Sequence, residues 1–170
     1  MQKQNNTFWY DGPRDMLAKL DREIEALSKI GRLDNHRKAD TVLNAAAITA
    51  WQLADWVTST ITTVQRSRVE TIFGDGIPLD QLFLTDLNLH ICRQIATAGK
   101  HVEIKRHHDP YVQTKAALVF DFESAQPALE WMISVDHRDT HVTVKEVLGG
   151  ARDFWSKFLD VMDRHRSTWY

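Results

Sequence analysis

The feature that most constrains this sequence is a double apolar stripe between residues 34 and 66. In the first stripe, apolar residues follow one another at alternating spacings of four and three, which places them on one face of an α-helix. Its members are Leu43, Ala47, Ala50, Ala54, Val57, Ile61 and Val64, and the neighbouring stripe holds Val42, Ala46, Leu53 and Trp56. Because more than half of the circumference is then apolar, we expect a central helix over 36–66 that its neighbours enclose.

Three other segments carry an apolar stripe of helical period. They predict helices over 14–30, 79–98 and 145–165. The first of these begins after Pro13, and proline is favoured in the first turn of a helix because its missing N–H would have no partner there. Together with the central helix, the three segments predict a four-helix bundle in which the helices are antiparallel and the central helix touches the other three.

Between about 111 and 144 the apolar residues alternate with polar ones, and this period of two is typical of half-buried β-strands. Pro127 ends the first run, and a polar turn at 137–140 separates the second run from the third. We therefore predict a small antiparallel β-meander inserted before the last helix. The expected fold class is α+β, and a length of 170 residues suits a single domain over 1–170.

Charge and cysteine content exclude several classes of function. The formal net charge of −2 gives no overall attraction to nucleic acid or to an anionic membrane, so any such binding has to be local. No apolar run is long enough for a membrane span, and the single cysteine, Cys92, rules out an intrachain disulfide. We expect a cytoplasmic protein with no membrane contact. Because the sequence lacks a glycine-rich phosphate loop and paired cysteines, we predict no cofactor.

A polar stripe on the predicted helix over 79–98 marks the candidate site. It consists of Asp86, His90, Arg93, Gln94 and Thr97, and it points toward Lys100 and His101. On the central helix, Asn44, Trp51 and Asp55 share another stripe. If the two stripes face each other, Asp55 lies near Arg93 or His90 in a buried polar site. If they do not, the stripe is solvated and Asp55 pairs with a neighbour.

The string from Cys92 to His101 resembles the arginine and histidine constellation of HEPN domains, which are helical bundles that include metal-independent ribonucleases and non-catalytic nucleotide-binding relatives. Gln94 fits the polar residue that usually follows the arginine, whereas seven residues separate Arg93 from His101, a longer spacing than is usual in that family. The resemblance implies that His101 acts as general acid or base on a ribose hydroxyl and that Arg93 stabilises phosphate charge. The segment 50–57 also resembles bacterial helical-bundle proteins of similar length whose activity is uncharacterised.

Basic residues and histidines follow this helix. Lys100, Lys105 and Arg106 are expected to form an exposed, partly basic loop that could meet phosphate or an acidic partner. The histidines at 101–108 and 137–141 could instead share a metal ion, as histidines do in other bundles. The second group flanks a predicted turn between strands, so its spacing alone does not establish a metal site.

Two main classes of function stay open from the sequence. In the first, the protein acts on or binds RNA or a nucleotide, as a toxin or an antiphage component. Arg93 and His101 would then be catalytic, and the substrate-binding residues would be Asp55, His90, Lys100, Lys105 and Arg106. In the second, the protein is a non-catalytic interaction module or homodimer that buries its alanine-rich helix or its aromatic ends against a partner. A metal-binding bundle is a third alternative.

Overall fold

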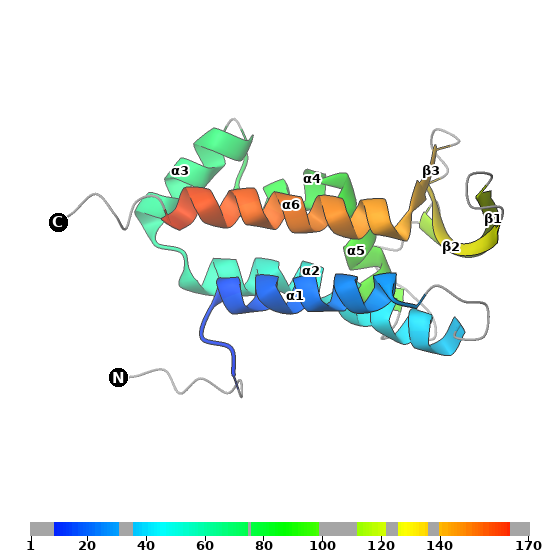
Figure 1. Ribbon diagram of the computed structural model, residues 1–170. Helices are drawn as coiled ribbons and strands as arrows, with labels where there is room; N and C mark the ends of the chain where they lie inside the picture. Colours follow the sequence, from blue (N-terminus) through cyan, green and yellow to red (C-terminus); the bar gives the residue numbers. More distant parts are fainter. Residues whose placement is uncertain are drawn as a thin grey trace.

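A computed structural model describes residues 9–30, 36–74, 76–98, 112–121, 126–135 and 140–163 of the chain (Figure 1). The helices are α1 (Pro13–Ser28), α2 (His36–Thr60), α3 (Thr63–Gly74), α4 (Leu79–Thr85), α5 (Leu87–Ala98) and α6 (Val144–Asp163). The strands are β1 (Val112–Asp121), β2 (Gln126–Val135) and β3 (Thr140–Thr143). In Figure 1, α1 and α2 run side by side in opposite directions, and α6 lies along them. The predicted helical bundle is confirmed.

The central helix of the bundle is α2. It contacts α1, α5 and α6, and the alanines on its inner face, Ala46, Ala47 and Ala50, have no exposed surface. The first apolar stripe is buried as far as Val57. Val64, the last residue of the predicted stripe, is 66% exposed because it lies beyond α2 in a separate helix.

A hydrogen bond fixes the contact between α2 and α6. The indole Nε1 of Trp155 donates to the backbone oxygen of Ala50 at 2.8 Å, and neither residue has exposed surface. Tryptophan is seldom buried completely because it is large, and when it is buried its N–H needs a partner inside the protein. Here the small side chain of Ala50 allows the indole to reach the backbone of α2. Trp155 is therefore buried with its polar group satisfied.

The predicted helix over 36–66 ends early, at Thr60. Thr62 and Gln65 form a capping box that starts α3. The hydroxyl of Thr62 accepts a hydrogen bond from the backbone N–H of Gln65 at 3.3 Å, and Oε1 of Gln65 accepts one from the backbone N–H of Thr62 at 2.9 Å. These bonds satisfy N–H groups at the start of a new helix, so the boundary predicted at residue 66 is corrected to Thr60 and a further helix follows.

The predicted helix over 79–98 is likewise divided in two. Asp86 has an extended backbone with ψ of 121°, and its Oδ1 accepts a hydrogen bond from the backbone N–H of Leu89 at 3.0 Å. Aspartate is a favoured N-cap because its carboxylate satisfies a free N–H of the first turn. Asp86 therefore ends α4 and caps α5, and it does not belong to one continuous polar stripe.

An aromatic cluster attaches α3 and α4 to α6. The ring centroids of Phe73 and Phe158 are 5.3 Å apart, and those of Phe83 and Trp155 are 5.0 Å apart. Aromatic pairs of this kind stabilise a protein by roughly 0.5–1.5 kcal/mol each beyond the burial of their area. Helices as short as α3 and α4 are marginal alone, so we attribute their stability mainly to this packing.

The strands pair in the order β1-β2-β3. β1 and β2 are antiparallel, from Val112 opposite Val135 to Asp121 opposite Gln126. β3 pairs with the C-terminal part of β2 only, and it leads directly into α6. The backbone pairing thus places the strands at the N-terminal end of α6 (Figure 1).

Helices make up most of the described chain. The bundle is therefore the established class of the fold, and the assignment to an α+β class with a β-meander stays a prediction. None of the described helices combines the length and the apolar character that a membrane crossing requires.

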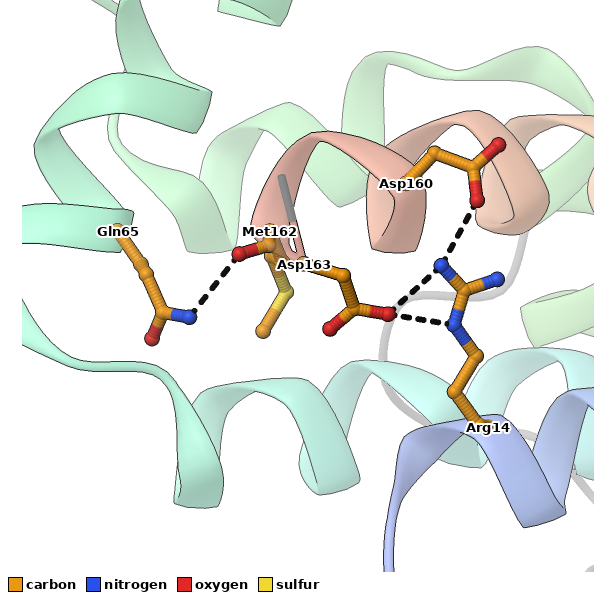
Figure 2. A network of polar contacts seen from close by, with 5 residues as sticks. All are labelled: Arg14, Gln65, Asp160, Met162 and Asp163. Carbon is orange, nitrogen blue, oxygen red and sulfur yellow. Dashed lines mark hydrogen bonds and ion pairs between the residues drawn. The ribbon is translucent and has the colours of Figure 1, made fainter. Parts of the chain in front are cut away.

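Figure 2 shows polar contacts that join three helices at the C-terminal end of α6. Arg14 of α1 donates through Nε to Asp163 at 2.8 Å and through Nη2 to Asp160 at 2.7 Å. Gln65 of α3 donates to the backbone oxygen of Met162 at 3.2 Å. The ion pairs are about half exposed, so each contributes at most about 1 kcal/mol. Because they join the start of α1 to the end of α6, they favour the antiparallel arrangement of these helices.

Two adjacent glycines in α6 have different surroundings. A Cβ at Gly150 would overlap the side-chain amide of Asn88 in α5, whereas a Cβ at Gly149 would meet nothing. Glycine inside a helix costs roughly 1 kcal/mol relative to alanine. The close approach of α5 to α6 therefore explains Gly150, and nothing in the packing requires Gly149.

We expect Gly149→Ala to raise the free energy of unfolding by roughly 1 kcal/mol, and Gly150→Ala to give no such gain. Chemical denaturation of the two variants measures the difference. In an Asn88→Ala background, Gly150→Ala should raise the free energy of unfolding as Gly149→Ala does, because the overlapping amide has been removed. Equal effects of the two glycine substitutions would show that the side-chain amide of Asn88 does not restrict position 150.

Candidate functional site

The candidate site is organised around Arg93 in the middle of α5. Its guanidinium lies over the indole ring of Trp51 in α2, with 5.5 Å between Cζ and the ring centroid. Both side chains are half-buried. A cation over the face of a tryptophan is stabilised by roughly 0.5–2 kcal/mol, and the planar guanidinium is held in one orientation. Trp51 therefore positions Arg93 at the interface of α2 and α5.

Asp55 lies one turn beyond Trp51 on α2, and its side chain is exposed. α2 and α5 do contact each other, as the two predicted stripes require. Within the described residues, however, Asp55 forms no ion pair with Arg93, whose guanidinium lies over Trp51 instead. The direct pair of Asp55 and Arg93 is thus replaced by a contact between Arg93 and an aromatic ring.

The other members of the predicted stripe differ in their surroundings. Gln94 is 6% exposed and belongs to the core, where it has an interaction partner. The hydroxyl of Thr97 donates to the backbone oxygen of Arg93 at 2.7 Å, so it is used within its own helix. His90 is half-buried in the turn before Arg93 and also has an interaction partner. His90 is therefore the predicted substrate-binding residue that shares a helix with Arg93.

The remaining predicted residues follow α5, which ends at Ala98. Lys100, His101, Lys105 and Arg106 lie outside the described residues, so their assigned roles stay predictions. In the part of the chain that the structure describes, no three His, Cys, Asp or Glu side chains cluster as metal ligands would. Of the predicted histidine group at 101–108 and 137–141, His101, His107, His108 and His137 fall outside that part as well.

Sequence reasoning missed a polar contact between α1 and α2. Lys19 Nζ donates to Glu23 at 2.6 Å and also to the hydroxyl of Thr49, which has no exposed surface. Oε2 of Glu23 is buried without a hydrogen-bond partner in the described structure. The spacing of Lys19 and Glu23 is a signal for their pairing, but nothing in the sequence indicates that Thr49 lies opposite them. Because the cation is already neutralised, we interpret this contact as structural.

Cys92 is a structural thiol. It is fully buried in α5, and burial, with a smaller effect from the carboxylate of Asp86, raises the pKa of the thiol from 9.0 to about 12. The thiolate is the nucleophilic form of cysteine, so a thiol with such a high pKa is unreactive near neutral pH.

We expect native Cys92 to resist an aromatic disulfide reagent at pH 8, because burial both blocks access and keeps the thiol protonated. Unfolding returns the pKa to about 9, so the same reagent should then react fully. Absorbance of the released aromatic thiolate, with and without denaturant, measures the difference. Rapid stoichiometric modification of the native protein would show that Cys92 is accessible.

Comparisons with known proteins identify no family for this chain. No protein-family model matches it, and neither does any curated protein or solved structure. The site is therefore defined by its own geometry. It consists of a guanidinium held on an indole ring where α2 meets α5, shortly before a segment of the sequence that carries further basic residues.

Proposed function

We propose that the protein binds RNA or a nucleotide through Arg93, as a HEPN-like protein. The supporting observation is the position of the guanidinium over Trp51, with no carboxylate paired to it in the described chain. Arg14 and Arg152, by contrast, are neutralised by aspartates between helices. A guanidinium with no acidic partner is available to a phosphate group, to which it donates two parallel hydrogen bonds.

The segment after α5 would supply the chemistry. In this proposal His101 removes the proton of a ribose hydroxyl, and the oxygen attacks the adjacent phosphorus while the displaced ribose oxygen takes up a proton. Arg93 stabilises the charge that develops on the phosphate oxygens. The remaining residues contact the substrate, namely Asp55, His90, Lys100, Lys105 and Arg106. Such metal-independent cleavage of RNA in the cytoplasm would suit a toxin or an antiphage component.

A second candidate function is a non-catalytic interaction module or homodimer, built on an α+β domain. Exposed apolar residues outside the core favour it, with Val64 at 66% and Ile72 at 57% exposed. Both lie on α3, whereas Arg93 lies on α5, so the two functions do not exclude each other. A metal-binding bundle would instead use the histidines at 101–108 and 137–141.

Fluorescence anisotropy with a labelled single-stranded RNA tests the main proposal. We expect Arg93→Ala to weaken binding by roughly 10- to 100-fold, as the loss of a charged hydrogen-bonded contact does. The RNA affinity of Arg93→Lys should lie between those of the wild type and Arg93→Ala, because lysine keeps the charge but loses the planar fork. Arg22→Ala is the matched control, since Arg22 is an exposed arginine on α1, and it should bind as the wild type does.

Cleavage of the same RNA in the presence of a chelator tests the catalytic role. His101→Ala should abolish cleavage while leaving the thermal midpoint unchanged, because the residue lies beyond the end of α5. Cleavage that the chelator removes would favour the metal-binding alternative. If RNA affinity is absent, or if Arg93→Ala leaves it unchanged, the proposal is wrong.

A further inference from the structure

Exposed large apolar side chains concentrate on one part of the chain, residues 64–87. Among the described residues, the large apolar side chains that face solvent are Trp9, Val64, Ile72, Ile77, Leu84 and Leu87. Val64 and Ile72 belong to α3 and Leu84 to α4, whereas Ile77 lies between these two helices and Leu87 is the first residue of α5. In Figure 1 α3 and α4 lie on the side of the bundle away from α1. Such a concentration is typical of an interaction surface, whereas scattered exposed residues are not.

The outer face of α3 combines apolar residues with one cation. A shallow hollow follows this face, and its described lining is Thr63, Val64, Ser67, Arg68, Thr71 and Ile72. Arg68 lies one helical turn from Val64 and one turn from Ile72. No described residue forms an ion pair with Arg68. A partner that covers this face must therefore supply a negative charge among apolar groups.

The neighbouring helix α4 carries the opposite charge. Asp80 lies in its first turn and is exposed, and it also lacks an ion pair among the residues that the structure describes. α3 and α4 contact each other. One segment of the chain thus offers an unpaired cation, an unpaired anion and the exposed apolar residues.

We propose that this α3–α4 segment, residues 63–87, is the interface of a homodimer. In a two-fold interface, a contact from one residue to a second is repeated in reverse, so the same surface has to complement itself. Arg68 then pairs with Asp80 of the second copy, and Asp80 pairs with its Arg68. Charge complementarity favours a second copy of this chain as the partner, because the segment itself carries both the cation and the anion that such pairs require. The proposal rests on the second candidate function, the homodimer, and identifies its interface; it does not depend on Arg93.

Sedimentation equilibrium of the nuclease-treated full chain tests the proposal by measuring the dissociation constant of the dimer. Arg68→Glu and Asp80→Lys should each weaken the dimer by about tenfold or more, because symmetry places the two like charges together twice. The double variant exchanges the charges but keeps each pair, so it should recover most of the affinity. Arg22→Glu, a charge reversal on α1, is the matched control and should change nothing.

Ile72→Ser provides a readout that does not depend on charge. The substitution should weaken the dimer at least as much as one charge reversal does. Because Ile72 is 57% exposed in the single chain, thermal unfolding of the dilute protein should stay unchanged. A wild type that is monomeric at every concentration would overturn the proposal, and so would a double variant as weak as the single ones. No RNA is present in this experiment, so it tests the dimer proposal independently of the RNA-binding proposal.

Discussion

The arrangement of the helices depends on the hydrogen bond from Trp155 to the backbone of Ala50. Trp155 has no exposed surface, so a shift of α6 away from α2 would leave a buried N–H without a partner. The bond forms because the small side chain of Ala50 lets the indole reach the backbone of α2. Phe83 also packs against Trp155 and attaches α4 to the same helix. Trp155 thus contacts both α2 and α4 and joins these helices to α6.

The helical part of this arrangement could be predicted from the sequence, because the period of apolar residues determines which face of a helix is buried. Prediction failed where local capping competes with the apolar stripe. Val64 continues the stripe of α2 in the sequence, but the capping box of Thr62 and Gln65 starts a new helix before it. Asp86 similarly divides a helix whose apolar period is uninterrupted. Both capping signals are present in the sequence, and a stretch of β-branched residues at the end of α2 weakens the competing continuous helix.

The candidate site could be predicted less fully, for a geometric reason. Spacing shows which residues share a face of one helix, but the residue opposite them depends on how far the neighbouring helix is shifted along its axis. The sequence left open whether the stripes of Asp55 and Arg93 face each other. In the structure α2 and α5 contact each other, and Arg93 lies over Trp51. A tryptophan ring holds the guanidinium without neutralising it, which a carboxylate would do. This difference is the reason that Arg93 is available to an anionic ligand in our proposal.

The close contact of α6 with α2 is tested most directly by enlarging one alanine of α2 and measuring the free energy of unfolding in denaturant. Ala50→Leu should lower it by roughly 1–3 kcal/mol, because the added atoms would separate Trp155 from the backbone of α2. Ala45→Leu is the matched substitution on the same helix, at a half-buried position outside the core, and it should change the value by about 0.5 kcal/mol or less. If the two variants are equally stable, α6 does not pack on Ala50 and this account of the bundle is wrong.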